Sequence, residues 1–334
     1  MYLGIEIGGT KLQLGIGPDD GKLRGLWRGA VDVAAGPEGI RRQITAAVPE
    51  LLARAGVERS QLRGIGIGFG GPVDDATHTV IQSHQIEGWD NFPLAKWIRE
   101  VVGLPAALGN DADCAGLAEA LFGAGKGLSP IFYITIGSGI GGGLIINGEV
   151  YRGTGRGAAE IGHLRTRAPY QEWPTTPEGL REFFESRLPT YAPLEEFASG
   201  WAISRRAQIE ASRKFDRDSP LFRLVFGKPE RINASVLGQA AAEGDWLARR
   251  ILKEMTDQVA EAIVHVVSLL CPRRIIIGGG VSLMGESLLF QPLRQLVAQR
   301  VFLPFADCYD IVPAALGEEV VVHGALVLAR RRFG

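Results

Sequence analysis

Asn110 and Asp111 stand where the sequence predicts that a strand gives way to a helix. A short apolar run over residues 105–108 stops at Gly109, and after Asp111 small and apolar residues recur at helical spacing. A carboxylate at this point can cap the helix N-terminus, and it faces the edge of the sheet where ligands bind in open α/β proteins. On this segment alone a helix cap is the simpler interpretation of Asp111. The alternative is a base, because a carboxylate within hydrogen-bond reach of a hydroxyl can accept its proton.

Two glycine-rich turns between apolar strands are the next candidates for chemistry. One is Gly8-Gly9-Thr10-Lys11 and the other is Gly137-Ser138-Gly139. Because glycine has no Cβ, such a turn can approach a phosphate closely and direct N–H groups at it, and each turn adds a hydroxyl donor. Either turn alone could be only a tight connection. The pair, from opposite halves of the chain, could hold a polyphosphate between them.

Two common nucleotide-binding motifs are not supported. The spacing G-x-G-x-x-G occurs from Gly66 and again from Gly137. A dinucleotide fingerprint must lead into a helix that holds the pyrophosphate, whereas these stretches lead into a polar loop and into another strand. The sequence also lacks G-x-x-x-x-G-K-[ST]. We therefore expect neither a Rossmann dinucleotide site nor a P-loop.

The elements that must position these residues repeat along the chain. Antiparallel strands around a glycine turn, followed by a helix and another strand, predict a mixed sheet with helices on its faces. The glycine turn recurs between apolar strands in the second half, which indicates duplication of one α/β unit. The expected strands are residues 2–7, 12–17, 22–30, 61–69, 131–136, 144–147, 274–277 and 310–313, and the expected helices are residues 36–55, 92–102, 194–213, 234–243, 245–270 and 318–332.

The composition is that of a globular protein with two domains. The chain has 334 residues, of which 46% are hydrophobic and 22% charged. Its net charge of −1 gives no electrostatic reason to expect nucleic acid or a membrane surface as a partner. The three cysteines have no CxxC spacing, no apolar run is long enough to span a bilayer, and the first strand follows Met1 without a signal peptide. We expect a cytoplasmic protein whose cysteines are small buried hydrophobic residues.

Nine segments, in order along nearly the whole chain, resemble the ROK family of repressors, uncharacterised frames and sugar kinases. Each segment alone is weak, but nine in the right order are specific. The segments are GIEIGGTKLQLGI (4–16), GIGIGFGGPVD (64–74), IEGWDNFPL (86–94), GNDADCAGLAE (109–119), ITIGSGIGGGLIING (134–148), GAAEIGH (157–163), LEEFASGWA (194–202), IIIGGGVS (275–282) and LGEEVVVHGALVLA (316–329).

The resemblance implies an α/β protein with the two-domain actin-like ATPase, or ribonuclease H-like, fold, with mixed sheets and a cleft between the domains. Residues 1–110 and 315–334 would form the smaller domain, to which the C-terminal helix returns, and residues 111–314 the larger one. The family likeness also implies a homodimer.

The resemblance further implies an ATP-dependent hexose kinase that uses Mg²⁺. Asp111 would be the general base that takes the proton of a sugar hydroxyl, usually the 6-hydroxyl. The sugar would be held by Gly71, Asn110, Asp111, Glu160, His163 and Glu195. The nucleotide would be held by Gly8, Gly9, Thr10 and Lys11 in the first turn, by Gly137, Ser138 and Gly139 in the second, and by Gly278, Gly279 and Gly280 near the adenosine, with Glu6 tied to the phosphates and Mg²⁺.

Three departures from the family pattern qualify these roles. Glu6 stands where the family usually has Asp, which adds a methylene and shifts the metal geometry. His163 lacks the three cysteines of the family's zinc site, because residues 164–193 contain none, and we expect no zinc. We expect the proline- and aromatic-rich segment 164–193 to pack where the zinc site would be. Gln85 replaces the usual Asn, which weakens the choice of a particular sugar.

Three readings remain open in the sequence. A hexose kinase is favoured, with glucose as the default sugar and fructose, mannose or an N-acetylated hexosamine as alternatives, and with ATP or polyphosphate as donor. A sugar-responsive repressor would need an N-terminal helix-turn-helix, for which no room remains before Tyr2. A catalytically idle sugar- or nucleotide-binding protein is made possible by Glu6 and the missing zinc site, although Asp111 argues against it.

Overall fold

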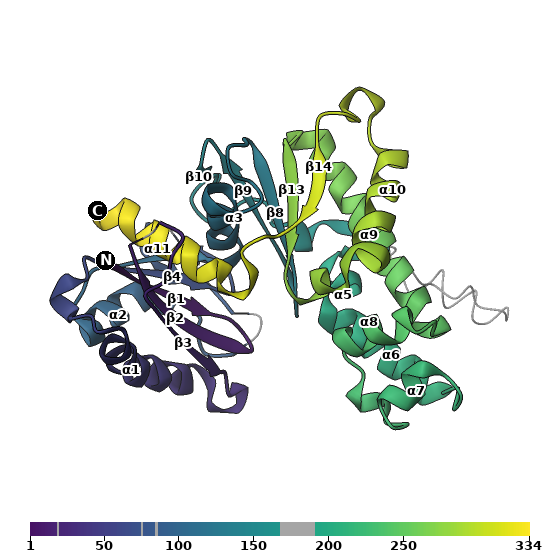
Figure 1. The fold of residues 1–334 in the computed structure, drawn as a ribbon, viewed down its shortest axis with the longest axis horizontal. Helices are drawn as coiled ribbons and strands as arrows, with labels where there is room; N and C mark the ends of the chain where they lie inside the picture. The colour runs from purple at the N-terminus through teal and green to yellow at the C-terminus, as the bar shows by residue number, and fades with distance from the viewer. Residues whose placement is uncertain (19, 75, 84–85, 168–190) are drawn as a thin grey trace.

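The computed structural model of the chain describes residues 1–18, 20–74, 76–83, 86–167 and 191–334. Within them lie two five-stranded mixed sheets, each covered by helices on both faces, and helices α3 (Asp111–Phe122) and α11 (Val320–Phe333) lie between the sheets (Figure 1). In these ranges no helix is both long and apolar enough to cross a membrane.

The first sheet has the strand order β3-β2-β1-β4-β7. The three N-terminal strands pair antiparallel, and β4 and β7 then add in parallel to β1. Helices α1 (Gly36–Ala55) and α2 (Leu94–Val102) cover one face, and α11 covers the other (Figure 1). The strands are β1 (Tyr2–Ile7), β2 (Lys11–Gly17), β3 (Gly25–Ala30), β4 (Ile65–Phe69) and β7 (Ala106–Asn110).

The second sheet repeats this topology with the order β10-β9-β8-β13-β14. Again two antiparallel pairings are followed by two parallel ones, as a duplicated unit requires. Its strands are β8 (Ile131–Ile136), β9 (Ile140–Ile146), β10 (Glu149–Val150), β13 (Arg274–Gly278) and β14 (Asp310–Pro313).

Helix α3 packs on one face of this second sheet, and a larger helical layer covers the other. The layer is built on the 25-residue helix α9 (Trp246–Leu270), whose apolar face is buried. The remaining helices are α5 (Glu195–Ala198), α6 (Gly200–Arg213), α7 (Pro220–Leu224), α8 (Ala234–Ala242) and α10 (Gln291–Arg300). The short strands β5 (Val73–Asp74) and β6 (Thr79–Val80) pair with each other, as do β11 (Arg165–Arg167) and β12 (Tyr191–Pro193).

Helices α3 and α11 cross at backbone distance. A Cβ added to Gly324 of α11 would overlap the carbonyl oxygen of Cys114 in α3, and one added to Gly66 of β4 would overlap that of Ala325. The crossover that leads from β14 into α11 is fixed from α3 as well. The buried Glu119 carboxylate accepts hydrogen bonds from Ala315 N (2.9 Å) and Leu316 N (2.8 Å), and from Ala124 N (2.7 Å) in the loop after α3.

Most expected elements are confirmed, and the differences have local causes. The strand expected at residues 61–69 begins at Ile65, because Arg59–Gln61 form a 3₁₀ turn. The helix expected at 194–213 divides at Ser199, whose side chain caps α6 by accepting from Ala202 N. Helix α10 was not expected. The packing suggested for segment 164–193 and the comment on Gln85 fall on residues 168–190 and 85, outside the described ranges. The domain limits 1–110 with 315–334, and 111–314, stay a prediction that follows the two sheets.

Replacing Gly324 by Ala is expected to lower the free energy of unfolding by about 1–3 kcal/mol, because an added methyl overpacks a contact between two backbones. Denaturant titration followed by circular dichroism would measure the change. Gly280→Ala is the matched control, since nothing lies within 4 Å of a Cβ added there. Equal losses in the two variants would contradict the close crossing of α3 and α11.

Candidate active site

Asn110, not Asp111, caps helix α3. Its backbone is extended, and its Oδ1 accepts hydrogen bonds from Ala112 N (2.9 Å) and Asp113 N (3.2 Å). Its Nδ2 donates to the carbonyl oxygen of Gly71 at 3.1 Å. The predicted sugar residues Gly71 and Asn110 are therefore in direct contact, and the interpretation of Asp111 as a simple cap is wrong.

Asp111 is the first residue of the helix, and Ala112 N donates to its Oδ1 at 2.8 Å. Desolvation and then the charge of Glu6 are the largest causes that raise the pKa of Asp111, which reaches about 7. The charges of Asp113 and Glu160 contribute to this rise, and the hydrogen bond from Ala112 N opposes it. A carboxylate with a pKa near neutrality is suited to accept and release a proton at physiological pH.

The first glycine turn lies beside this carboxylate. Gly8 N donates to Lys11 O at 3.0 Å to close the turn, and Gly70 N donates to Ile7 O at 2.9 Å. A Cβ on Gly70 would lie 3.4 Å from Asp111 Oδ2 and 3.6 Å from Gly8 Cα. The structure thus brings together the predicted base and the predicted phosphate turn, with only Gly70 between them.

Glu6 is buried beneath the first turn with both of its oxygens engaged. Lys11 Nζ lies 3.1 Å from Oε1, and Gln13 Nε2 donates to Oε2 at 2.8 Å. Burial raises the pKa of Glu6, and the Lys11 charge partly offsets this. Lys11 and Gln13 also donate to Glu318 O, at 3.1 and 2.9 Å, which ties the turn to the segment just before α11.

This arrangement does not make Glu6 a ready direct ligand for Mg²⁺, because a metal bond would have to displace Lys11 or Gln13. Among the described residues, no group of three or more His, Cys, Asp or Glu side chains is arranged to hold a metal ion.

The second glycine turn is bound by Glu195. Gly137 N donates to Gly139 O at 2.9 Å, and Ile140 N donates to Glu195 Oε2 at 2.7 Å. A Cβ on Gly139 would overlap that same carboxylate oxygen, so only glycine fits here. The side chain of Glu195, predicted as a sugar residue, therefore holds the turn that is predicted to bind phosphate.

The remaining predicted residues join this second group. A Cβ on Gly279 would lie 2.6 Å from Ile136 O, which sets the turn after β13 against the end of β8. Glu160 and His163 flank a 3₁₀ turn, where His163 N donates to Glu160 O at 3.1 Å, and both side chains are exposed. Gly162 in this turn packs against Ile140 O. The predicted site residues therefore form two clusters, one at each sheet. Asp111 lies where the two clusters meet.

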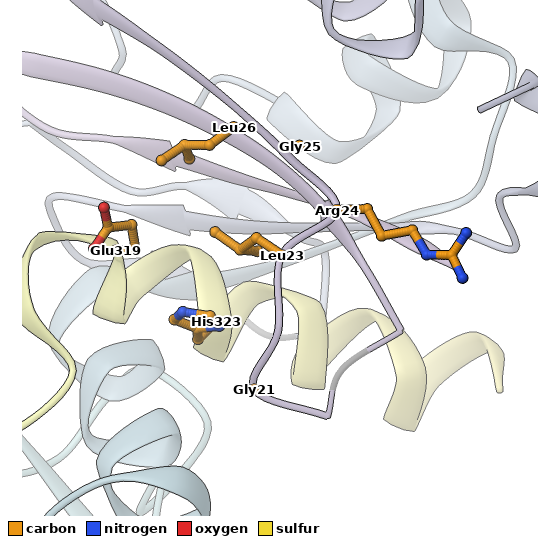
Figure 2. A pocket seen from close by; sticks show the side chains of 7 residues that line it. All are labelled: Gly21, Leu23, Arg24, Gly25, Leu26, Glu319 and His323. Carbon is orange, nitrogen blue, oxygen red and sulfur yellow. The ribbon is translucent and has the colours of Figure 1, made fainter. Parts of the chain in front are cut away.

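A pocket of about 440 Å³ lies away from this site, between the β2–β3 connection and α11 (Figure 2). His323 lines it from α11 and Glu319 from the turn just before that helix, while the Arg24 guanidinium points away from the other labelled side chains (Figure 2). Desolvation lowers the pKa of His323. The pocket contains none of the predicted site residues. Arg28 connects the pocket to the surroundings of Glu6, because it pairs with Glu319 and donates from Nε to Gln13 Oε1 at 3.0 Å.

Two sheets of the same topology, joined by a central helix pair with glycine turns at their strand ends, define the two-domain actin-like ATPase fold. The crystal structure of a ROK family glucokinase from Streptomyces griseus, in complex with glucose and AMPPNP, matches with a TM-score of 0.78 at 30% identity over 99% of each chain.

The ROK family model matches residues 2–332, and the chain belongs to this family. A glucokinase from Thermotoga maritima is 32% identical over 99% of this chain and 98% of its own length. A xylose repressor from Caldicellulosiruptor bescii is 27% identical over 79% of this chain and 62% of its own length.

Three polar residues of this region were missed from the sequence. Gln13 lies opposite Glu6 in the β1–β2 register, so the predicted hairpin could have identified it. Asp113 and Arg152 form a buried ion pair beside Asp111. Asp113 is visible as a second acidic residue in the first turn of the helix, but nothing in the sequence pattern singles out Arg152.

Asp111→Asn is expected to raise the Tm at pH 8 by ~2–4 °C. A change of about 1 kcal/mol in the free energy of unfolding shifts the Tm by this amount in domains of 150–250 residues. The folded pKa of about 7 lies above the ordinary value of 3.8 in the unfolded chain, so the favourable contribution of the protonated carboxyl is complete below pH 3.8 and lost as pH rises through 7. The gain from the amide should therefore be larger at pH 8 than at pH 5. Scanning calorimetry at both pH values measures it, and a lower Tm for the variant at pH 8 would contradict the desolvated carboxylate.

Proposed function

We propose that this protein phosphorylates a hexose hydroxyl with ATP, with the 6-hydroxyl of glucose as the first choice. The observation that carries the proposal is the position of Asp111 beside the first glycine turn, with a pKa near neutrality. A sugar hydroxyl is a poor nucleophile, and a carboxylate within reach takes its proton as the bond to phosphorus forms. The full-length likeness to glucokinases supports the same reaction.

In this proposal the nucleotide is held by the backbone of the glycine turns. Gly8 to Lys11 and Gly137 to Gly139 direct N–H groups and hydroxyls at the phosphates, and Gly278 to Gly280 lie toward the adenosine. Mg²⁺ enters as part of the nucleotide substrate, where it neutralises phosphate charge. Glu6 orients Lys11 and Gln13 in the first turn. The AMPPNP in the related glucokinase structure favours ATP over polyphosphate as donor.

The sugar is held in this proposal by polar groups from both domains. Gly71 and Asn110 come from the smaller domain, and Glu160, His163 and Glu195 from the larger one. Hydroxyl groups need donors and acceptors in fixed positions, which carboxylates, an amide and an imidazole provide. Closing the domains over the sugar would exclude water, the competing phosphoryl acceptor.

Asp111→Asn is expected to lower kcat by ~10²–10⁴-fold, the usual contribution of a general base. In the wild-type protein, kcat/KM should rise with pH and level off above about 7, because only the deprotonated carboxylate accepts the proton. A coupled assay for ADP release over a panel of hexoses measures both effects.

Asp218→Asn is the matched control, since this aspartate is exposed near the start of α7. It should leave kcat unchanged. If ATP or a sugar binds to the wild-type protein but no sugar stimulates ADP release, the protein is an idle binding member of the family and the kinase proposal is wrong.

A further inference from the structure

Arg152 lies where three segments of the proposed sugar site meet. It follows β10 in the larger domain, and its side chain is only 17% exposed. One guanidinium nitrogen, Nη1, forms an ion pair with Asp113 Oδ2 on helix α3. The other, Nη2, donates to Val73 O at 3.3 Å in the smaller domain. The same side chain therefore contacts the helix that begins with Asp111 and the loop that begins with Gly71.

The third segment is the loop that leads to Glu160. Gly155 N donates to Arg152 O at 2.9 Å, and a Cβ on Gly157 would lie 3.9 Å from Arg152 Nη1 and 3.4 Å from Glu160 Oε1. Gly153, Gly155, Gly157 and Ala159 all have positive φ angles, so this loop follows a path that few other sequences could adopt. The Arg152 guanidinium lies beside that path at Gly157.

The loop from Gly71 to Val73 is held from two sides. Asn110 Nδ2 binds the carbonyl oxygen of Gly71, and Arg152 Nη2 binds that of Val73, two residues later. Asn110 precedes Asp111 and Asp113 follows it in the same helical turn. The guanidinium is planar and presents several donors in fixed directions, so it can bind a carboxylate and a carbonyl together.

The ion pair between Arg152 and Asp113 also affects the charge around Asp111. The charged groups that act on Asp111 are Glu6 from β1, Asp113 from its own helix and Glu160 from the loop. All three are acidic. Arg152 places a positive charge against Asp113, whose side chain is 6% exposed and lies next to the proposed base.

We propose that Arg152 is a positioning residue that fixes the Gly71–Val73 loop and the Glu160 loop against helix α3 and neutralises Asp113 beside the base. The inference rests on the proposed sugar kinase function. Arg152 sets the sugar site through its neighbours. The proposed role of Arg152 has a structural part, the hydrogen bond to Val73 O, and an electrostatic part, the neutralisation of the Asp113 charge. Substitutions can separate the two parts.

Arg152→Met removes both parts. We expect KM for the sugar to rise by ~10-fold, which corresponds to a loss of about 1.4 kcal/mol in binding free energy. We also expect the acid limb of the kcat/KM profile to shift upward by ~0.5–1 pH unit, because the negative charge of Asp113 without Arg152 disfavours ionisation of Asp111. Arg152→Lys keeps the charge but not the fork of donors, so the acid limb should return toward that of the wild type while KM stays high. Arg152→Met with Asp113→Asn should likewise restore the acid limb without restoring KM.

Arg156→Met is the matched control in the same loop, because Arg156 is exposed. It should leave KM and the pH profile unchanged. Circular dichroism and Tm values establish that each variant is folded, and sugar affinity by calorimetry checks the change in KM directly.

The outcomes separate this inference from the proposed function. If wild-type protein phosphorylates a hexose and folded Arg152→Met keeps its KM, sugar affinity and pH profile, the positioning role is wrong. If KM rises but the acid limb moves equally in the Met and Lys variants, the electrostatic part is wrong. If the wild-type protein phosphorylates no hexose, the proposed function fails, and unchanged sugar affinity in Arg152→Met would then overturn the positioning role as well.

Discussion

The contact between α3 and α11 is the constraint on which the rest of the structure depends. The two helices cross with their backbones touching at Gly324 and Cys114, and each packs on a different sheet. Since α3 starts directly at the end of β7, its first residue lies at the junction of the two sheets. The carboxylate of Asp111 owes its position to backbone packing, which varies little with the surrounding side chains. A carboxylate fixed in this way is held in place independently of any ligand.

The site concentrates negative charge that the fold must stabilise locally. Glu6 and Asp113 are buried acids, and each is matched by a basic partner, Lys11 for the first and Arg152 for the second. Asp111 lies among them, and desolvation followed by the Glu6 charge raises its pKa to about 7. The carboxylates of Glu6 and Asp113 are thus held in ion pairs, while that of Asp111 has a strongly perturbed pKa, which is typical of functional sites.

Much of the fold and of the candidate site could be predicted from the sequence wherever the pattern depends on residues close together in the chain. Glycine turns between apolar strands and the strand-to-helix change at Asn110 and Asp111 depend on neighbouring residues, and both were confirmed in place. Which of the two caps α3 depends on a backbone angle that pattern alone does not resolve to one residue. Helix α10 buries only Leu293 and Val297, so its periodicity is too short to recognise. Arg152 belongs to an irregular loop, and its contacts arise from residues 39 and 79 positions away.

The return of α11 to the first sheet has a consequence for biosynthesis. Helix α11 supplies the apolar cover for β1 and β4 but is synthesised after the whole second sheet, and Glu119 fixes the crossover only when Ala315 and Leu316 have been made. The first sheet therefore cannot complete its fold as soon as its own strands have been synthesised. One of its apolar faces stays uncovered while the second sheet is made. During this interval the nascent chain exposes apolar surface that is prone to aggregation.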